Sequence, residues 1–317
     1  MTLHIVEPTK KTLHGHYSRD LVPILNITSG DSVRYRTLDA GWGLIENPNP
    51  FDKPPKFADR DRERDPGHAL CGPIAIQEAK AGMTLEVRFE TIRVGTWGWS
   101  AGGGYPSDVN TRLNLADSPE WILRWELDSV QKTARNQSGQ VIAIRPFMGN
   151  IGMPHDEAGR HSTFPPRFCG GNMDCKELVE GSGIFLPIAV DGGLFSLGDG
   201  HAVQGDGEVS GPALECPMEE VEVEFHLHPE MHLSYPRANT AEGWITFGFH
   251  EDLHEASMIA LDGMLELMVQ ECRLERKEAL ALSSLIVHLR VTQIVNGVRG
   301  VHAILPHEVL KGIARIR

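Results

Sequence analysis

Thr84-Leu-Glu-Val-Arg-Phe-Glu90 alternates apolar and polar side chains, and Asp31–Thr37 and Val221–His226 repeat this pattern. Because successive side chains of a strand point to opposite faces, a period of two predicts strands with one buried face. Thr28-Ser-Gly-Asp-Ser-Val33 and Lys80-Ala-Gly-Met-Thr-Leu85 each place a glycine turn shortly before the alternation. Such recurrent turns favour a mainly β fold, and we predict an antiparallel β-sandwich with jelly-roll or Greek-key connections.

The pattern changes in the last part of the chain, after His250. Apolar residues recur every three or four positions from Met258 to Cys272, which predicts a helix with one face on a core. Arg290–Val295 and Val298–Leu305 flank Asn296-Gly297. Because Asn-Gly is the favoured type I′ turn, these residues predict a β-hairpin.

Two stretches of the chain fit neither a strand nor a helix. Residues 41–68 are rich in Pro, Asp and Arg, and predict a long loop that lies over a site or is partly mobile. Residues 95–105 carry two tryptophans beside a glycine run, and we expect a loop whose tryptophans pack against their own domain rather than wall a pocket. We therefore expect a β-sandwich body over residues 1–245 that carries the functional motifs. Residues 246–317 would form an α+β segment docked on it.

The composition limits the class of protein and its partners. The 317 residues are 41% hydrophobic and 23% charged, as in an ordinary globular protein with a large core. The net charge of −13 and the lack of a basic run argue against nucleic acid or an anionic membrane as partners. The five scattered cysteines form no CxxC pair, and the N-terminus lacks a secretory pattern. We therefore expect a cytoplasmic protein with reduced cysteines.

A glycine-rich run, Leu194–Glu208, concentrates polar side chains. Its polar members are Asp199, His201, Gln204, Asp206 and Glu208, spaced by four glycines. Glycine accepts positive φ and a close backbone approach, so one loop can turn several polar groups inward. Carboxylates with an imidazole suit a divalent cation or an acid/base centre. The alternative is a pair of tight turns with solvated carboxylates.

Two motifs of the chain resemble those of the acetamidase/formamidase family. Gly198-Asp-Gly-His-Ala-Val-Gln-Gly-Asp-Gly-Glu208 is similar to the family's main signature, and Gly170-Gly-Asn-Met-Asp-Cys175 is similar to its second motif. Weaker similarity extends over Thr37–Ala40, Gly72–Ile74, Pro146–Gly152 and Leu178–Pro187. The resemblance implies an oligomeric, commonly dimeric, enzyme for formamide- or acetamide-like substrates. The Asn-Met-Asp motif and the chain length look more like the acetamidase branch.

Hydrolysis of a small linear amide to a carboxylate and ammonia requires a nucleophile, oxyanion stabilisation and a proton for the departing amine. A divalent cation, Zn²⁺ or Ca²⁺, supplies the first two by acidifying a water and polarising the carbonyl. We predict Asp174, Asp199 and His201 as its ligands, with Asp39 as a weaker candidate that also reads as a turn cap. Glu208 is the predicted acid/base, which makes Glu208, Asp174 and His201 the catalytic set.

Asn172 and Gln204 are the predicted substrate-binding residues. Their side-chain amides offer the donor and the acceptor that the two ends of a small amide require. Buried glycine-loop N–H groups would form the oxyanion hole. Alternatively, and equally well, both side chains hold the glycine-rich loop in place by hydrogen bonds and do not bind substrate.

Two rival interpretations stay open at this point. Cys175, with Glu208 as base and Lys176 nearby, would form a metal-free thiol amidase, although neighbouring strand residues point to opposite faces. His226, His228 and His232 form another histidine cluster. Should they bind metal, the chain would be a non-catalytic metal- or carbohydrate-binding β-sandwich, whereas a solvent-facing strand edge is the plainer interpretation.

Overall fold

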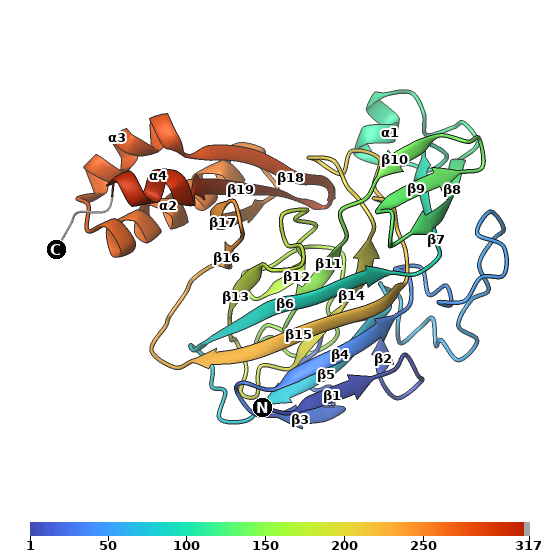
Figure 1. The fold of residues 1–317 in the computed structure, drawn as a ribbon, viewed down its shortest axis with the longest axis horizontal. Helices are drawn as coiled ribbons and strands as arrows, with labels where there is room; N and C mark the ends of the chain where they lie inside the picture. Colours follow the sequence, from blue (N-terminus) through green and yellow to red (C-terminus); the bar gives the residue numbers. More distant parts are fainter. Residues whose placement is uncertain (314–317) are drawn as a thin grey trace.

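One large sheet contains all three strands that the alternating patterns predict. The computed structural model describes residues 1–313, and its nine-stranded sheet has the order β1-β4-β15-β6-β13-β16-β17-β19-β18 (Figure 1). These strands are β1 (Leu3–Val6), β4 (Ser32–Thr37), β6 (Thr84–Val94), β13 (Gly183–Pro187), β15 (Met218–His228), β16 (Arg237–Asn239), β17 (Gly243–His250), β18 (His288–Asn296) and β19 (Val298–Pro306). The predicted strands are β4, β15 and β6, adjacent and antiparallel in this sheet.

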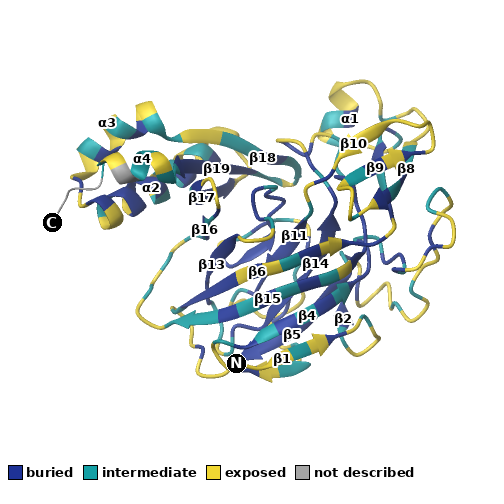
Figure 2. Cartoon of the chain, in the orientation of Figure 1, coloured by how far each residue is buried: buried dark blue, intermediate teal, exposed yellow. Residues whose placement is uncertain are grey.

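A six-stranded sheet lies against the first and completes the sandwich. It has the order β12-β11-β14-β5-β2, with β3 paired to β5. The strands are β2 (Leu13–His14), β3 (Leu25–Ile27), β5 (Leu70–Ile76), β11 (Phe147–Gly152), β12 (Gly170–Asn172) and β14 (Phe195–His201). Strands β5, β11 and β14 are buried along their whole length (Figure 2).

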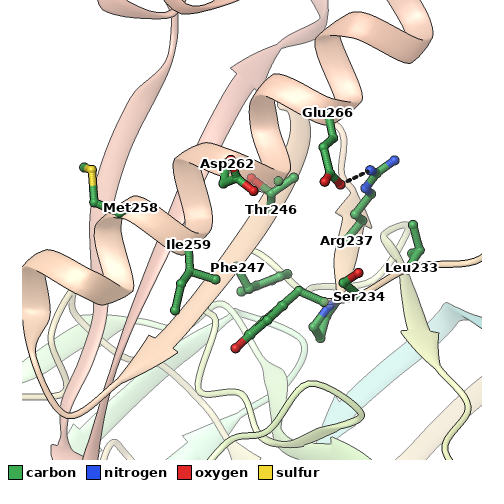
Figure 3. A pocket seen from close by; sticks show the side chains of 12 residues that line it. Leu233, Ser234, Arg237, Thr246, Phe247, Met258, Ile259, Asp262 and Glu266 are labelled. Atoms are coloured by element: carbon green, nitrogen blue, oxygen red, sulfur yellow. Dashed lines mark ion pairs between the residues drawn. The ribbon is translucent and has the colours of Figure 1, made fainter. Parts of the chain in front are cut away.

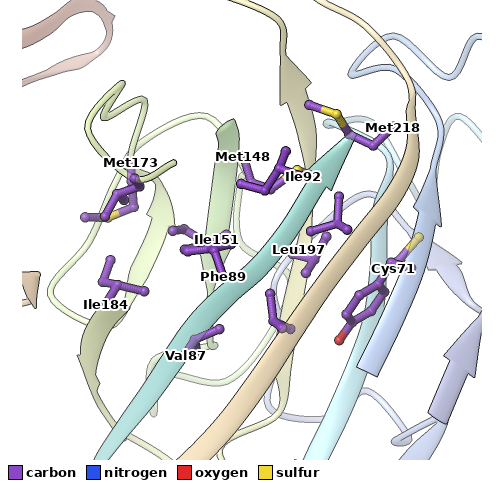
Figure 4. Close-up of a cluster of buried hydrophobic side chains, with 14 of the residues drawn as sticks. Cys71, Val87, Phe89, Ile92, Met148, Ile151, Met173, Ile184, Leu197 and Met218 are labelled. Atoms are coloured by element: carbon purple, nitrogen blue, oxygen red, sulfur yellow. The ribbon is translucent and has the colours of Figure 1, made fainter. Parts of the chain in front are cut away.

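The main core fills the space between these two sheets. Figure 4 shows Val87 and Phe89 of β6 in one cluster with Ile151 of β11 and Leu197 of β14. Side chains from both sheets therefore pack face to face, as in a β-sandwich. The prediction of a mainly β, antiparallel sandwich is confirmed.

A small sheet corrects the expectation of a loop at residues 95–105. Trp97–Gly102 form β7, the edge of a four-stranded sheet with the order β10-β9-β8-β7, and α1 (Asp108–Arg112) follows. The other members are β8 (Trp121–Asp128), β9 (Thr133–Asn136) and β10 (Val141–Ala143). Gly98 is required in β7 because a Cβ there would lie 2.7 Å from the Glu215 carbonyl oxygen. By contrast, residues 38–69 form neither a named strand nor a named helix, as predicted for the loop at 41–68.

The C-terminal helices and hairpin have their own core. Helices α2 (Leu253–Cys272), α3 (Arg276–Ile286) and α4 (His307–Ile313) accompany β17 and the β18–β19 hairpin. Buried side chains of α2, α3 and one face of β19 form a second cluster, whereas those of β17 belong to the main core. The predicted helix and hairpin are both confirmed, with Gly297 at φ +83° in the turn. Because β16 joins β13 to β17, the large sheet is continuous across residue 245, and the division into two units there stays a proposal.

The hairpin extends from the helices to the glycine-rich loop of the body (Figure 1). The Gly207 N–H donates to the Thr292 carbonyl at 3.2 Å, and the Ile294 N–H donates to the Gly207 carbonyl at 3.1 Å. No helix among residues 1–313 is long and apolar enough to cross a membrane.

Candidate active site

The two glycine-rich motifs meet on opposite sides of β11. This strand pairs with β12 on one side and β14 on the other, so that Asn150 lies opposite both Asn172 and Gly198. Asp199 and His201, two residues apart on β14, share one face of the sheet. Asp174 follows β12 with φ +46°, a backbone turn that brings its side chain back towards β11.

Gly149 of β11 lies directly beneath these side chains. A Cβ at this position would lie 2.8 Å from each of Asp174 Oδ1, Asp199 Oδ2 and His201 Cε1. Real Cβ atoms do not approach other atoms that closely, so only glycine leaves room for the three groups to converge. The Gly149 carbonyl also accepts the Asp174 N–H at 3.2 Å, which fixes the start of the Asp174 loop.

Gln204 determines how the His201 ring is oriented. Its Nε2 donates to the Asp174 carbonyl at 2.7 Å, so its Oε1, 3.0 Å from His201 Nδ1, must accept a proton from the ring. Nε2 of His201 therefore faces the acidic groups, at 3.3 Å from both Asp199 Oδ1 and Glu215 Oε1. A histidine held through its other ring nitrogen in this way is a typical metal ligand.

Glu215 belongs to this site although neither sequence motif contains it. It is 4% exposed and pairs with His201 through an isolated β-bridge. Its Oε1 accepts the Ala213 N–H at 3.0 Å. The available signal was a carboxylate between apolar neighbours, Leu214 and Cys216, both of which are buried.

Asp174 is held by two amide side chains. Its Oδ2 accepts from Asn172 Nδ2 at 2.9 Å and from Asn296 Nδ2 at 2.5 Å. Asn296 lies at the tip of the β18–β19 hairpin, so the C-terminal segment contributes directly to the site. The other oxygen, Oδ1, is buried and has no hydrogen-bond partner in the described part of the chain.

Burial and mutual repulsion shift the protonation of the acidic groups. Burial raises the pKa of Asp174 to about 8 and that of Glu215 to about 7, against the opposing charge of His201. Burial and the nearby Asp174 carboxylate raise the pKa of Glu208 well above its ordinary value. For Asp199, burial also acts upward, but the charges of His68 and His201 outweigh it and hold the pKa far below the usual range. Four carboxyl groups packed this closely cannot all ionise unless positive charge compensates them.

The cluster fits a divalent cation. Two sets of side chains have ligand atoms within 4.8 Å of one another, Asp174–His201–Glu208 and Asp199–His201–Glu215. Within residues 1–313, four buried atoms of these groups lack a hydrogen-bond partner: Asp174 Oδ1, His201 Nε2, Glu208 Oε2 and Glu215 Oε2. Carboxylate oxygens with one imidazole are donors that divalent metals accept.

A cavity of about 490 Å³ opens above the cluster. Asp199, Glu208 and Glu215 contribute to its lining, together with Asn172, Trp99 and Phe164. Trp97 is buried as expected, but Trp99 walls the cavity, which corrects the expectation that both tryptophans only pack against their own domain. A hollow of about 420 Å³ lies elsewhere, between α2 and residues 233–237, where Arg237 forms an ion pair with Glu266 at 3.5 Å (Figure 3). No candidate metal-ligand group of the described residues lies in that hollow, whereas members of two such groups line the first cavity.

Residues 4–158 and 156–241 match the acetamidase/formamidase family. The chain belongs to this family. It is 52% identical over 258 residues to an acetamidase of Mycolicibacterium smegmatis, covering 62% of this chain and 61% of that protein. It is 26% identical over 256 residues to a formamidase of Methylophilus methylotrophus, covering 62% of this chain and 60% of that protein. The chain thus spans about 60% of the length of these curated relatives.

Solved structures of the acetamidase/formamidase family share the fold over nearly the whole chain. A predicted acetamidase/formamidase of Thermoanaerobacter tengcongensis superposes with a TM-score of 0.83 at 25% identity, over 100% of this chain and 99% of that one. An acetamidase of Yersinia enterocolitica gives 0.82 at 27% identity, over 97% and 93% of the two chains.

The structure brings most of the predicted acetamidase-like site residues together. Asp174, Asp199, His201 and Glu208 lie in the cluster just described. Asp39 belongs to neither ligand set of the described residues. Its oxygens accept from the Gly43 N–H and, at 2.8 Å, from Trp99 Nε1. These bonds close the turn after β4, which is the capping role that the sequence also allowed.

Both predicted substrate-binding amides lie at the site but are engaged within the protein. Asn172 donates to Asp174, and its Oδ1 accepts from Asn150 Nδ2 at 3.0 Å. Both ends of Gln204 are used, as described above, by His201 and the Asp174 backbone. Of the two, Asn172 lines the cavity.

The structure gives the rival interpretations no support. Cys175 is fully buried, burial raises the pKa of its thiol, and Sγ donates to Glu177 Oε2 at 3.3 Å. Lys176 pairs with Asp206 at 2.8 Å. His226 and His228 each form an ion pair, at 2.8 Å to Glu224 and 2.7 Å to Glu86, and neither belongs to a ligand set of the described residues.

Proposed function

We propose that this protein hydrolyses small linear amides of the formamide or acetamide class to a carboxylate and ammonia. The observation that carries the proposal is the buried group of Asp174, His201, Glu208 and Glu215, whose unpartnered atoms meet beneath an open cavity. An acetamidase and a formamidase are among the relatives of this chain, and the acetamidase has the higher identity. We therefore infer an acetamidase-like activity.

A divalent cation would be held by Asp174, Asp199 and His201, with Glu215 as a further ligand. The imidazole favours Zn²⁺ over Ca²⁺, because Ca²⁺ takes oxygen ligands. When bound, such a cation supplies an acidified water and polarises the amide carbonyl. Gln204 keeps the proton of His201 on Nδ1 and leaves Nε2 directed at the cluster. We therefore assign Gln204 to positioning His201 rather than to substrate binding.

Glu208 is the proposed acid/base. Its carboxyl group lines the cavity, and burial raises its pKa, which makes the ionised carboxylate a stronger base towards water. The same proton then passes to the amide nitrogen as the C–N bond breaks, so that water and amide become carboxylic acid and ammonia. Asn172, at the cavity wall, would hydrogen-bond the substrate amide.

The cellular setting forms part of the same proposal. All five cysteines are free and buried in the described chain, which fits a reducing, cytoplasmic location. We also propose a homodimer, as the family resemblance implies.

The test is ammonia release from formamide, acetamide and propionamide, before and after chelation and re-addition of Zn²⁺ or Ca²⁺. We expect chelator-sensitive turnover that metal restores. Glu208→Gln should lose at least about 10²-fold in kcat while the folded protein keeps its metal. Activity that chelators do not lower but thiol alkylation abolishes would indicate Cys175, and not a metal-bound water, as the nucleophile. Absence of ammonia release from all three amides would favour a non-catalytic metal- or carbohydrate-binding β-sandwich.

A further inference from the structure

A second buried cluster follows the Asp174 loop and contains Cys175, Glu177 and His302. Their residues are 0%, 1% and 1% exposed. The Cys175 thiol lies 3.3 Å from Glu177 Oε2, and His302 Nε2 lies 3.4 Å from the same oxygen. The three potential ligand atoms lie within 4.8 Å of one another.

The His302 ring has an unsatisfied nitrogen that points into this cluster. Its Nδ1 lies 2.7 Å from Thr292 Oγ1, which fixes the ring. Its Nε2 is buried and makes no hydrogen bond of acceptable geometry to any described residue. Its nearest acceptor is Glu177 Oε2 at 3.4 Å, and because a buried polar atom without a well-formed hydrogen bond is costly, this nitrogen is available to a better ligand.

We propose that Cys175, Glu177 and His302 bind a Zn²⁺ ion that is separate from the cation of the active site. Thiolate, imidazole and carboxylate are the ligands of tetrahedral zinc, with metal–ligand distances of about 2.0–2.3 Å. Such distances place ligand atoms roughly 3.3–3.7 Å apart, close to the observed 3.3 and 3.4 Å. Binding replaces the thiol proton, which leaves to solvent, and a water completes the coordination.

Neighbouring groups already hold two of the three ligands in position. Arg290 Nη1 donates to Glu177 Oε1 at 2.9 Å, which leaves Oε2 directed at the cluster. Thr292 orients His302 through the ring nitrogen that would not bind metal. The charge of the ion balances one thiolate and one carboxylate. Without metal, Cys175 donates to Glu177, Arg290 compensates the charge of Glu177, and His302 Nε2 is left without a hydrogen bond.

The position of the site gives it a structural role. Arg290, Thr292 and His302 belong to the β18–β19 hairpin, while Cys175 and Glu177 follow Asp174 in the body. A zinc ion here would tie the hairpin to the loop that carries Asp174. It would thereby stabilise the contact between Asn296 and Asp174 in the active site that we propose.

Cobalt substitution tests this site without any substrate. Among the ligand sets of the described residues, only that of Cys175 contains sulfur, so we assign a thiolate-to-cobalt charge-transfer band in the near ultraviolet to Cys175. We expect the band in the full-length protein loaded with Co²⁺, its loss in Cys175→Ser and His302→Gln, and its retention in His201→Asn. Cys272→Ser is the matched control, since Cys272 is equally buried but lies in α2, outside the ligand sets of the described chain. It should keep the band.

Zinc content gives an independent readout. We expect two Zn²⁺ per wild-type chain, and one in each of the folded Cys175→Ser, His302→Gln and His201→Asn proteins. If Cys175→Ser does not fold, the cobalt charge-transfer bands of the wild-type and His302→Gln proteins test the zinc site. Absence of the band in folded, cobalt-loaded wild-type protein, or its persistence in His302→Gln, overturns the zinc site. An inactive protein that still shows the band would refute the amidase proposal and leave this one standing.

Discussion

Gly149→Ala adds a single methyl group at the point where Asp174, Asp199 and His201 converge. The new Cβ would lie 2.8 Å from one atom of each side chain, whereas ordinary contact begins at 3.4 Å. The three groups must therefore retreat by about 0.6 Å if the backbone stays fixed. Because β11 is buried and paired on both sides, the strand itself has little freedom to move.

We expect this displacement of the three side chains to lower activity strongly and stability only modestly in Gly149→Ala. A misplacement of about 1 Å costs on the order of 10²-fold in rate, so we expect kcat/KM to fall roughly 30- to 100-fold. Overpacking of a buried site lowers the free energy of unfolding by about 1–3 kcal/mol. A folded protein with damaged chemistry is the expected result.

The assay compares kcat/KM for acetamide, metal content and urea unfolding in Gly149→Ala and Gly205→Ala. Gly205 lies in the same glycine-rich run, and a Cβ there would meet no described atom within 4 Å outside its chain neighbours. We expect Gly205→Ala to stay within about twofold of wild type in kcat/KM. If Gly149→Ala folds and keeps wild-type kcat/KM, the cluster above Gly149 is not the catalytic site and the reasoning fails.

Three further predictions concern groups that surround the cluster or stabilise the chain. Asn296→Ala removes a hydrogen bond to the Asp174 carboxylate and should lower kcat/KM about 10-fold, measured on acetamide, while the thermal midpoint shifts little. Gln204→Met frees the His201 ring and should weaken metal binding about 10- to 100-fold in a chelator competition, and unchanged affinity would contradict the positioning role. Hydrogen bonds, first that from the Thr28 N–H, hold the pKa of Asp31 at about 2, below 3.8 in the unfolded chain. The stability from Asp31 is therefore complete above pH 3.8 and is lost as the pH falls through 2, so the difference in unfolding midpoint between wild type and Asp31→Asn should shrink over this range.

The strands that the sequence predicted are those with one solvated face. β4, β6 and β15 alternate because they lie in the large sheet with one face on the core. β5 and β14 are buried on both faces, so their residues carry no alternation to detect. β7 was missed because its two glycines and two tryptophans resemble a loop, and only pairing with β8 makes it a strand.

Some residues of the candidate site could be predicted from short sequence motifs, whereas others reach it only through contacts between distant parts of the chain. Asp199, His201 and Glu208 were predictable because they occupy one short glycine-rich run, and Asp174 because it belongs to a motif of its own. Glu215 and Asn296 were not predicted, since the place of the first in the site depends on a β-bridge to His201 and that of the second on a hairpin 122 residues beyond Asp174. Asp39 was predicted from its position as a weaker ligand but lies outside the cluster, because a carboxylate at a strand end serves equally well as a turn cap.

The hairpin that reaches the glycine-rich loop couples the proposed active site to the stability of the C-terminal segment. Its residues lie beyond the segment that matches the family, 4–241, and pack through Val298 and Ile304 on the main core and through Val301, Ala303 and Leu305 on the core of the C-terminal helices. Local opening of that core would withdraw Asn296 while the sandwich stays intact. If this opening needs less free energy than unfolding of the whole chain, thermal loss of the proposed activity should precede loss of the β-sheet signal. Sequence changes in the helices would then adjust the temperature range of the proposed activity with no substitution near the cavity.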